Sequence, residues 1–187
     1  NQVSINIEPE NLDITHILRR FIADDVLTLI KDGRGRFYNP QTGFNNIGDW
    51  NTANGYQMYL TEARTLDVSG RIIPIDRPIE LEEGWNLKAY YPWHPIDVKR
   101  ALAGIVEQLH IVKDGYGNFY LPEFDFRNIG DMTEGNGYQY KMNEAAELIY
   151  QMNGGDNQSP HVIKQPEFFT NVNTTELNMS VLIMGDP

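Results

Sequence analysis

Residues 31–38 read KDGRGRFY, and residues 113–120 read KDGYGNFY. The offset of 82 residues between the two segments continues without a gap through Leu66 and Leu148. Along this offset, four glycines and one tyrosine recur at matched positions. They form a repeat signature made of Gly33, Gly35, Gly48, Gly55, Tyr56, Gly115, Gly117, Gly130, Gly137 and Tyr138. Self-similarity at a fixed period indicates a tandem duplication, so each candidate site is compared with its copy.

The duplication predicts two homologous modules, at residues 1–70 and 71–150. Residues 151–160 read QMNGGDNQSP, a polar stretch with two Gly, two Asn and a Pro, which is typical of a linker. Residues 161–187 are too few for a domain of their own, and we expect them to add strands to the second module or to begin a following domain.

In the second copy, Gly84 and Trp85 precede the helical stretch, and their counterparts in the first copy would fall before Asn1. We therefore expect the first copy to lack its first residues and the chain to be a piece of a longer protein.

Apolar residues recur at helical spacing near the start of each copy. They are Ile14, Ile17, Leu18, Phe21 and Ile22 in the first copy and, shifted by 84, Val98, Ala101, Leu102, Ile105 and Val106 in the second. Asp13 and Asp97 precede these stripes, where a carboxylate can cap the free amides of a helix. Asp-Gly pairs at 32–33 and 114–115 indicate hairpins. The pattern predicts an α+β fold in which each module is a small, mostly antiparallel sheet with one amphipathic helix.

The composition excludes several classes of partner. The formal net charge is −11, with 15 basic against 26 acidic residues, which disfavours nucleic acid and anionic lipid. No apolar run approaches the roughly 18 residues that span a membrane, so membrane insertion is not expected. The chain has no cysteine, which removes disulfides and thiol chemistry. A cysteine-free, acidic composition with many Asn and Tyr favours an extracellular or cell-surface location.

Four motifs together resemble a known kind of repeat. They are GWNL at residues 84–87, VKDGYGNFYLP at 112–122, NIG at 128–130 and GYQ at 137–139. The pattern is similar to a repeat module of large secreted or surface multidomain bacterial proteins, and the similarity covers roughly residues 1–150. It implies that neighbouring domains of the same polypeptide are partners, and it implies no chemistry for particular residues.

Four carboxylates recur at matched positions, and they are the candidate metal ligands. They are Asp32, Asp49, Asp114 and Asp131, and hard cations such as calcium prefer several oxygen ligands. No Asp-x-Asp-x-Asp-Gly loop is present, and Asp residues also fold back onto turn amides. We expect no cofactor, with calcium as the alternative.

No catalytic motif stands out. The pairs Gly33/Gly35 and Gly115/Gly117 are followed by strand patterns rather than by a helix, unlike a dinucleotide loop. The four histidines, His16, His94, His110 and His161, share no ligand spacing. We expect a non-catalytic protein. The alternative is a fragment of a carbohydrate-active or other hydrolytic enzyme that uses a carboxylate pair at the interface between the modules.

Aromatic side chains are the most informative candidates for binding. Tyr56 and Tyr138 recur in apolar context and are expected in the core. Trp50, Trp93 and Tyr116 have no aromatic counterpart in the other copy, so we expect them to be exposed and to bind a ligand. The sequence therefore predicts a module for surface display and spacing, or for binding a glycan or an extracellular protein.

Overall fold

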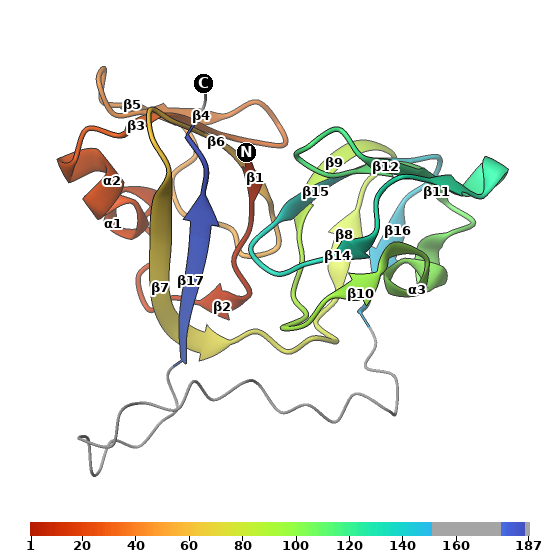
Figure 1. Ribbon diagram of the computed structural model, residues 1–187. Coiled ribbons are helices and arrows are strands. Elements are labelled where there is room, and N and C mark those ends of the chain that lie inside the picture. The colour runs from red at the N-terminus through yellow and green to blue at the C-terminus, as the bar shows by residue number, and fades with distance from the viewer. Residues whose placement is uncertain (151–176, 186–187) are drawn as a thin grey trace, which may run out of the picture.

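The computed structural model describes residues 1–150 and 177–185, and most of its elements are strands (Figure 1). The first copy contains β1 (Gln2–Val3), β2 (Ile7–Glu8), β3 (Leu27–Asp32), β4 (Phe37–Asn39), β5 (Phe44–Asn45), β6 (Tyr56–Leu60) and β7 (Arg64–Ile72). The second copy contains β8 (Ile79–Leu81), β9 (Gly84–Ala89), β10 (Ile96–Asp97), β11 (Leu109–Lys113), β12 (Phe119–Leu121), β13 (Phe126–Arg127), β14 (Asp131–Met132), β15 (Gly137–Met142) and β16 (Ala146–Leu148). The last strand is β17 (Leu177–Ile183).

The predicted α+β class is wrong, because the fold is mainly antiparallel β. Among the described residues, the α-helices are α1 (Ile14–Ile17), α2 (Arg19–Ala23) and α3 (Val98–Ala101), and short 3-10 turns lie at η1 (Ala103–Ile105) and η2 (Pro122–Phe124). Asp13 and Asp97 cap α1 and α3 by accepting backbone N–H bonds. The apolar stripes are largely buried, but the backbone leaves helical geometry at Leu18 and Leu102, so no long helix forms.

The two copies build the same five-stranded sheet. The strand order is β1-β6-β3-β4-β5 in the first copy and β9-β15-β11-β12-β13 in the second. The two Asp-Gly hairpins have the same turn geometry. The second glycine of each has a positive φ, which is 81° for Gly35 and 90° for Gly117. Only glycine takes this conformation without strain, which explains why the second glycine is present in both copies.

Each copy has its own core. The first core gathers buried residues from Val3 to Val68 together with Met179 and Ile183, and the second gathers residues from Ile73 to Tyr150. Trp93 comes from the second copy but packs against the first core.

One of our two predictions for residues 161–187 was that they add strands to the second module. This is wrong for β17. It pairs antiparallel with β7 along residues 177–183 and so extends the first copy. The expected linker at 151–160 lies outside the described residues.

The contacts between the copies are reciprocal. Val3 bridges Asn136, and its counterpart Lys88 bridges Asn54. The two counterparts are identified by register, since Val3 pairs with Tyr56 and Lys88 pairs with Tyr138. Two backbone hydrogen bonds repeat the exchange: the Ser4 N–H donates to Gly135 O at 3.0 Å, and the Ala89 N–H donates to Ala53 O at 3.1 Å. The copies are therefore related by a pseudo-two-fold axis, like the subunits of an isologous dimer.

Four other signature glycines, Gly33, Gly55, Gly115 and Gly137, lie on this interface. A Cβ on Gly55 would lie 3.1 Å from the Cα of Gly137, and a Cβ on Gly137 would lie 3.1 Å from the Cα of Gly55. A Cβ on Gly33 would lie 2.9 Å from the Leu87 Cβ. The duplicated glycines thus allow the backbones of the two copies to approach closely.

Candidate functional site

A polar groove lies where the edge strand β9 of the second copy meets the β3–β4 turn of the first. It consists of two adjoining hollows of about 410 and 350 Å³. Both are lined by Asp32, Gly33, Trp85, Asn86 and Leu87. The groove exists only because the two copies are packed together, and it has residues from both.

Trp85 is the aromatic side chain at this groove. It is 52% exposed, and the Lys113 ammonium lies 5.1 Å from the centre of its ring. A cation over an indole face is attracted by the ring's quadrupole, which restrains the ring while leaving part of it accessible. Trp85 is not among the residues that the sequence predicted to bind a ligand. Its partner in β15 is Lys141, on the polar side of that strand, so strand pairing would have indicated that Trp85 faces solvent.

Asn86 fixes the backbone that presents Trp85. This buried amide accepts a hydrogen bond from the Glu82 N–H at 2.9 Å and donates to the carbonyls of Glu82 and Gly84 at 2.7 and 3.2 Å. Gly84 has φ +89°, which closes the turn between β8 and β9. The base of the tryptophan is therefore rigid before any ligand arrives.

Charged and amide side chains line the rest of the groove. Five cationic residues, Lys31, Arg34, Arg36, Arg77 and Lys88, face three acidic ones, Asp32, Glu80 and Glu82, and Gln57 and Gln139 add amides. This balance contrasts with the strongly acidic chain as a whole. Burial lowers the pKa of the Lys88 ammonium, whose Nζ lies 3.5 Å from Asn54 Oδ1.

The acidic residues of the groove that form ion pairs are not arranged as a catalytic pair. Arg34 donates to Glu82 at 2.6 Å, and Arg36 Nε donates to Asp32 at 2.7 Å. An acid–base pair needs two carboxyls with differently tuned pKa values, whereas these carboxylates are paired with guanidinium groups. Elsewhere, burial raises the pKa of the Glu134 carboxyl.

The structure separates the three predicted ligand-binding aromatics. Trp50 is only 1% exposed and packs on Tyr56 with ring centres 4.2 Å apart, so its predicted exposure is wrong. Trp50 is part of the first core. The absence of an aromatic residue at the matching position of the second copy therefore did not mean that Trp50 is exposed. Trp93 is half-buried against the same core. Tyr116 is 72% exposed, on the turn between β11 and β12. None of the three lines the hollows described for this chain.

The four predicted metal ligands have two different structural roles. Asp32 and Asp114 close their turns: each accepts two backbone N–H bonds, and each also accepts one side-chain bond, from Arg36 or Asn118. Asp49 and Asp131 lie at the strand pairings with Asp13 and Asp97. Within residues 1–150 and 177–185, no cluster of three or more His, Asp or Glu side chains could hold a metal ion.

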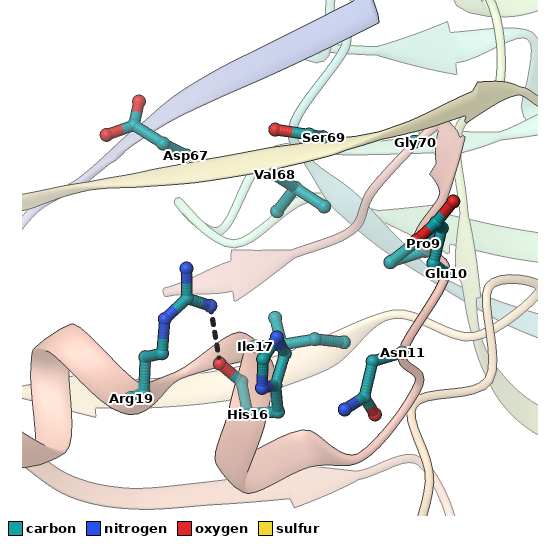
Figure 2. Close-up of a pocket in the computed structure, with 10 residues that line it drawn as sticks. All are labelled: Pro9, Glu10, Asn11, His16, Ile17, Arg19, Asp67, Val68, Ser69 and Gly70. Atoms are coloured by element: carbon teal, nitrogen blue, oxygen red, sulfur yellow. Dashed lines mark hydrogen bonds between the residues drawn. The ribbon is translucent and has the colours of Figure 1, made fainter. Parts of the chain in front are cut away.

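A third hollow, of about 390 Å³, lies in the first copy between α1 and β7 (Figure 2). Arg19 Nη1 donates to the His16 carbonyl at 2.9 Å on one side, and Ser69 and Asp67 stand on the other. Its lining contains no aromatic residue other than His16. The groove beside Trp85 is the better candidate, because it combines a flat aromatic surface with hydrogen-bonding groups from both copies.

No family model, curated protein or solved structure matches this chain. In the part of the chain that the structure describes, no helix is long and apolar enough to cross a membrane.

Proposed function

We propose that this chain is a non-catalytic module of an exported, surface-located bacterial protein and that its groove beside Trp85 binds a glycan. The half-exposed indole at a polar groove carries the proposal. A flat, rigid ring with a polar edge offers a large contact area at low entropic cost, and sugar rings present flat apolar faces to such a surface.

The surroundings of Trp85 favour a sugar over a macromolecular partner. The hollows are of the size that takes a small ligand, whereas a stable protein interface needs a surface of about 800 Å² on each partner. Gln57 and Gln139 lie in the same hollow as Trp85, and amides both donate to and accept from hydroxyl groups. The mixture of cationic and acidic groups also suits a ligand with many hydroxyls more than one of a single charge.

The test is binding of a panel of soluble polysaccharides, measured by affinity electrophoresis and calorimetry. Trp85→Ala is expected to weaken binding of the bound glycan at least about tenfold, which is about 1.4 kcal/mol. Tyr116→Ala is the matched control, because it removes an exposed aromatic outside the groove. Equal weakening by both variants, or no effect of Trp85→Ala on a glycan that binds, would contradict the assignment. A wild-type chain that binds none of the panel would favour the spacing role.

A further inference from the structure

β17 takes the place in the first copy that β8 takes in the second. In the second copy, β16 pairs with β8, and Leu148 lies opposite Ile79. In the first copy, the counterpart of β16 is the start of β7, where Leu66 lies opposite Val181. Ala146 and Leu81 match Arg64 and Ile183 in the same way. The two strands therefore dock in the same register although they lie about 100 residues apart in the chain.

The pattern of burial supports this equivalence. In β8, Ile79 and Leu81 are buried and Glu80 is exposed. In β17, Ile183 is 1% exposed, whereas Leu182 is 65% exposed. The inward side chains of β17 join the first core, so the first copy is completed by a strand from beyond the second copy.

The exchange of strands is reciprocal. Although β8 lies in the second copy, it is the next strand after β7 along the chain, as β17 is the next described strand after β16. β8 pairs with β16, and β17 pairs with β7. This is the arrangement of a strand-exchanged dimer, here closed within one chain. A strand that docks by backbone pairing and alternating apolar contacts can come from any chain with the same sequence.

We infer that the edge of β7 is a strand-acceptor site and that it also accepts β17 from a second copy of this chain, so that copies link by strand exchange. A neighbour's β17 offers the same backbone groups and the same inward apolar side chains, Met179 and Ile183, as the chain's own β17. The two strands therefore compete for the edge of β7 when the protein is concentrated.

Disulfide trapping tests this inference in the 187-residue chain, which has no native cysteine. Thr65 and Leu182 lie opposite each other in the β7–β17 pair, and both are exposed. Opposed residues of an antiparallel pair have Cα separations that a disulfide can bridge. The double variant Thr65→Cys with Leu182→Cys is expected to form a bond within one chain, which checks the register.

The decisive sample mixes the single variants Thr65→Cys and Leu182→Cys at high concentration, exposes them briefly to mild denaturant and oxidises them after refolding. A mixture of Thr65→Cys with Tyr116→Cys is the control for random contacts. We expect several-fold more covalent dimer in the first mixture, and more at higher protein concentration. Equal dimer in the two mixtures would overturn the inference, and so would failure of the double variant to crosslink. Circular dichroism confirms that each variant is folded.

Discussion

At the scale of single residues, the repeat signature has two different physical origins. Gly35 and Gly117 are present in both copies because their backbone φ is positive, whereas Gly55 and Gly137 are present because each touches the other. A turn glycine can be recognised from local sequence, because Asp-x-x-Gly patterns mark hairpins. A glycine required by a contact between the copies looks the same in the sequence, so its role was not predictable.

Gly137→Ala tests the contact role. Its Cβ would lie 3.0 Å from the Val3 carbonyl oxygen and 3.1 Å from the Gly55 Cα, both of which are backbone atoms. We expect a loss of about 1–3 kcal/mol in the free energy of unfolding, measured by urea denaturation. Gly130→Ala is the control, because no atom lies within 4 Å of the new Cβ and the backbone conformation is ordinary. A similar loss in both variants would mean that backbone freedom, not contact, explains the effect.

Buried tyrosines predict instability at alkaline pH. Burial raises the pKa of Tyr56 to about 12 and that of Tyr91 to about 12, from the ordinary value of 10.0. The unfolded chain loses these protons near pH 10 and the folded chain retains them, so their stabilisation is complete below about pH 10 and is lost as the pH rises toward 12. In that window, each of these tyrosines lowers the free energy of unfolding by about 1.4 kcal/mol per pH unit.

The measurement is the free energy of unfolding in urea at a series of alkaline pH values. Tyr56→Phe should reduce the slope by the share of one tyrosine, although it also leaves the Asn51 N–H, now bonded to the phenol oxygen at 2.8 Å, without its partner. A stability that is flat from about pH 10 to 12 would contradict the prediction.

At the scale of elements, the β3–β4 hairpin depends on one carboxylate. Asp32 is buried and accepts the N–H groups of Arg34 and Arg36, both at 2.9 Å. Asp32→Ala is expected to cost about 1–3 kcal/mol, because it removes the acceptor of two partly buried backbone N–H bonds and of the Arg36 guanidinium. Asp32→Asn should cost less, since the amide oxygen still accepts. Urea unfolding measures both.

The same variants separate turn chemistry from metal binding. Because the Asp32 oxygens are engaged by protein donors, calcium and EDTA are expected to leave the melting temperature of the wild-type chain unchanged. A rise with calcium that Asp32→Ala abolishes would instead support the metal site. Ligand binding to the native state would appear in such melts by mass action.

For the helices, the sequence predicted which residues are buried but not how long the helices are. The apolar stripes identified largely buried residues, such as Ile14 and Leu102, but they did not determine helix length. Five apolar positions span about two helical turns. The helical geometry is interrupted at Leu18, before α2, and at Leu102, before η1, so each stripe is divided between two short segments. Local periodicity therefore predicted the wrong fold class, α+β, because tertiary packing limits the helices to short segments and the fold is mainly β.

At the scale of the whole molecule, the sequence predicted the duplication but not how the copies meet. The 82-residue offset does not indicate which surfaces of the two copies contact each other. The groove and the exposure of Trp85 both depend on that meeting, as Leu87 packs on the turn at Gly33 of the other copy. The candidate site was consequently missed, although its residues lie within and beside the repeat motifs.

The reciprocal interface predicts that the two copies unfold together. Backbone hydrogen bonds cross between them at Ser4 and Ala89, and Trp93 of the second copy packs on the first core. Leu60→Ala and Met142→Ala remove buried side chains at equivalent positions of the two cores, and each should cost about 2–5 kcal/mol.

Both variants should shift one transition, with the same midpoint by tryptophan fluorescence and by far-ultraviolet circular dichroism. Coincidence of two probes is the criterion for two-state unfolding. Leu182→Ala, at a side chain that is 65% exposed, is the control and should change stability by less than about 0.5 kcal/mol. Two separate transitions, each shifted by only one of the core variants, would show that the copies are independent domains. A single transition would show that the interface couples them, because two cores that share no stabilising contact have no reason to unfold at one midpoint.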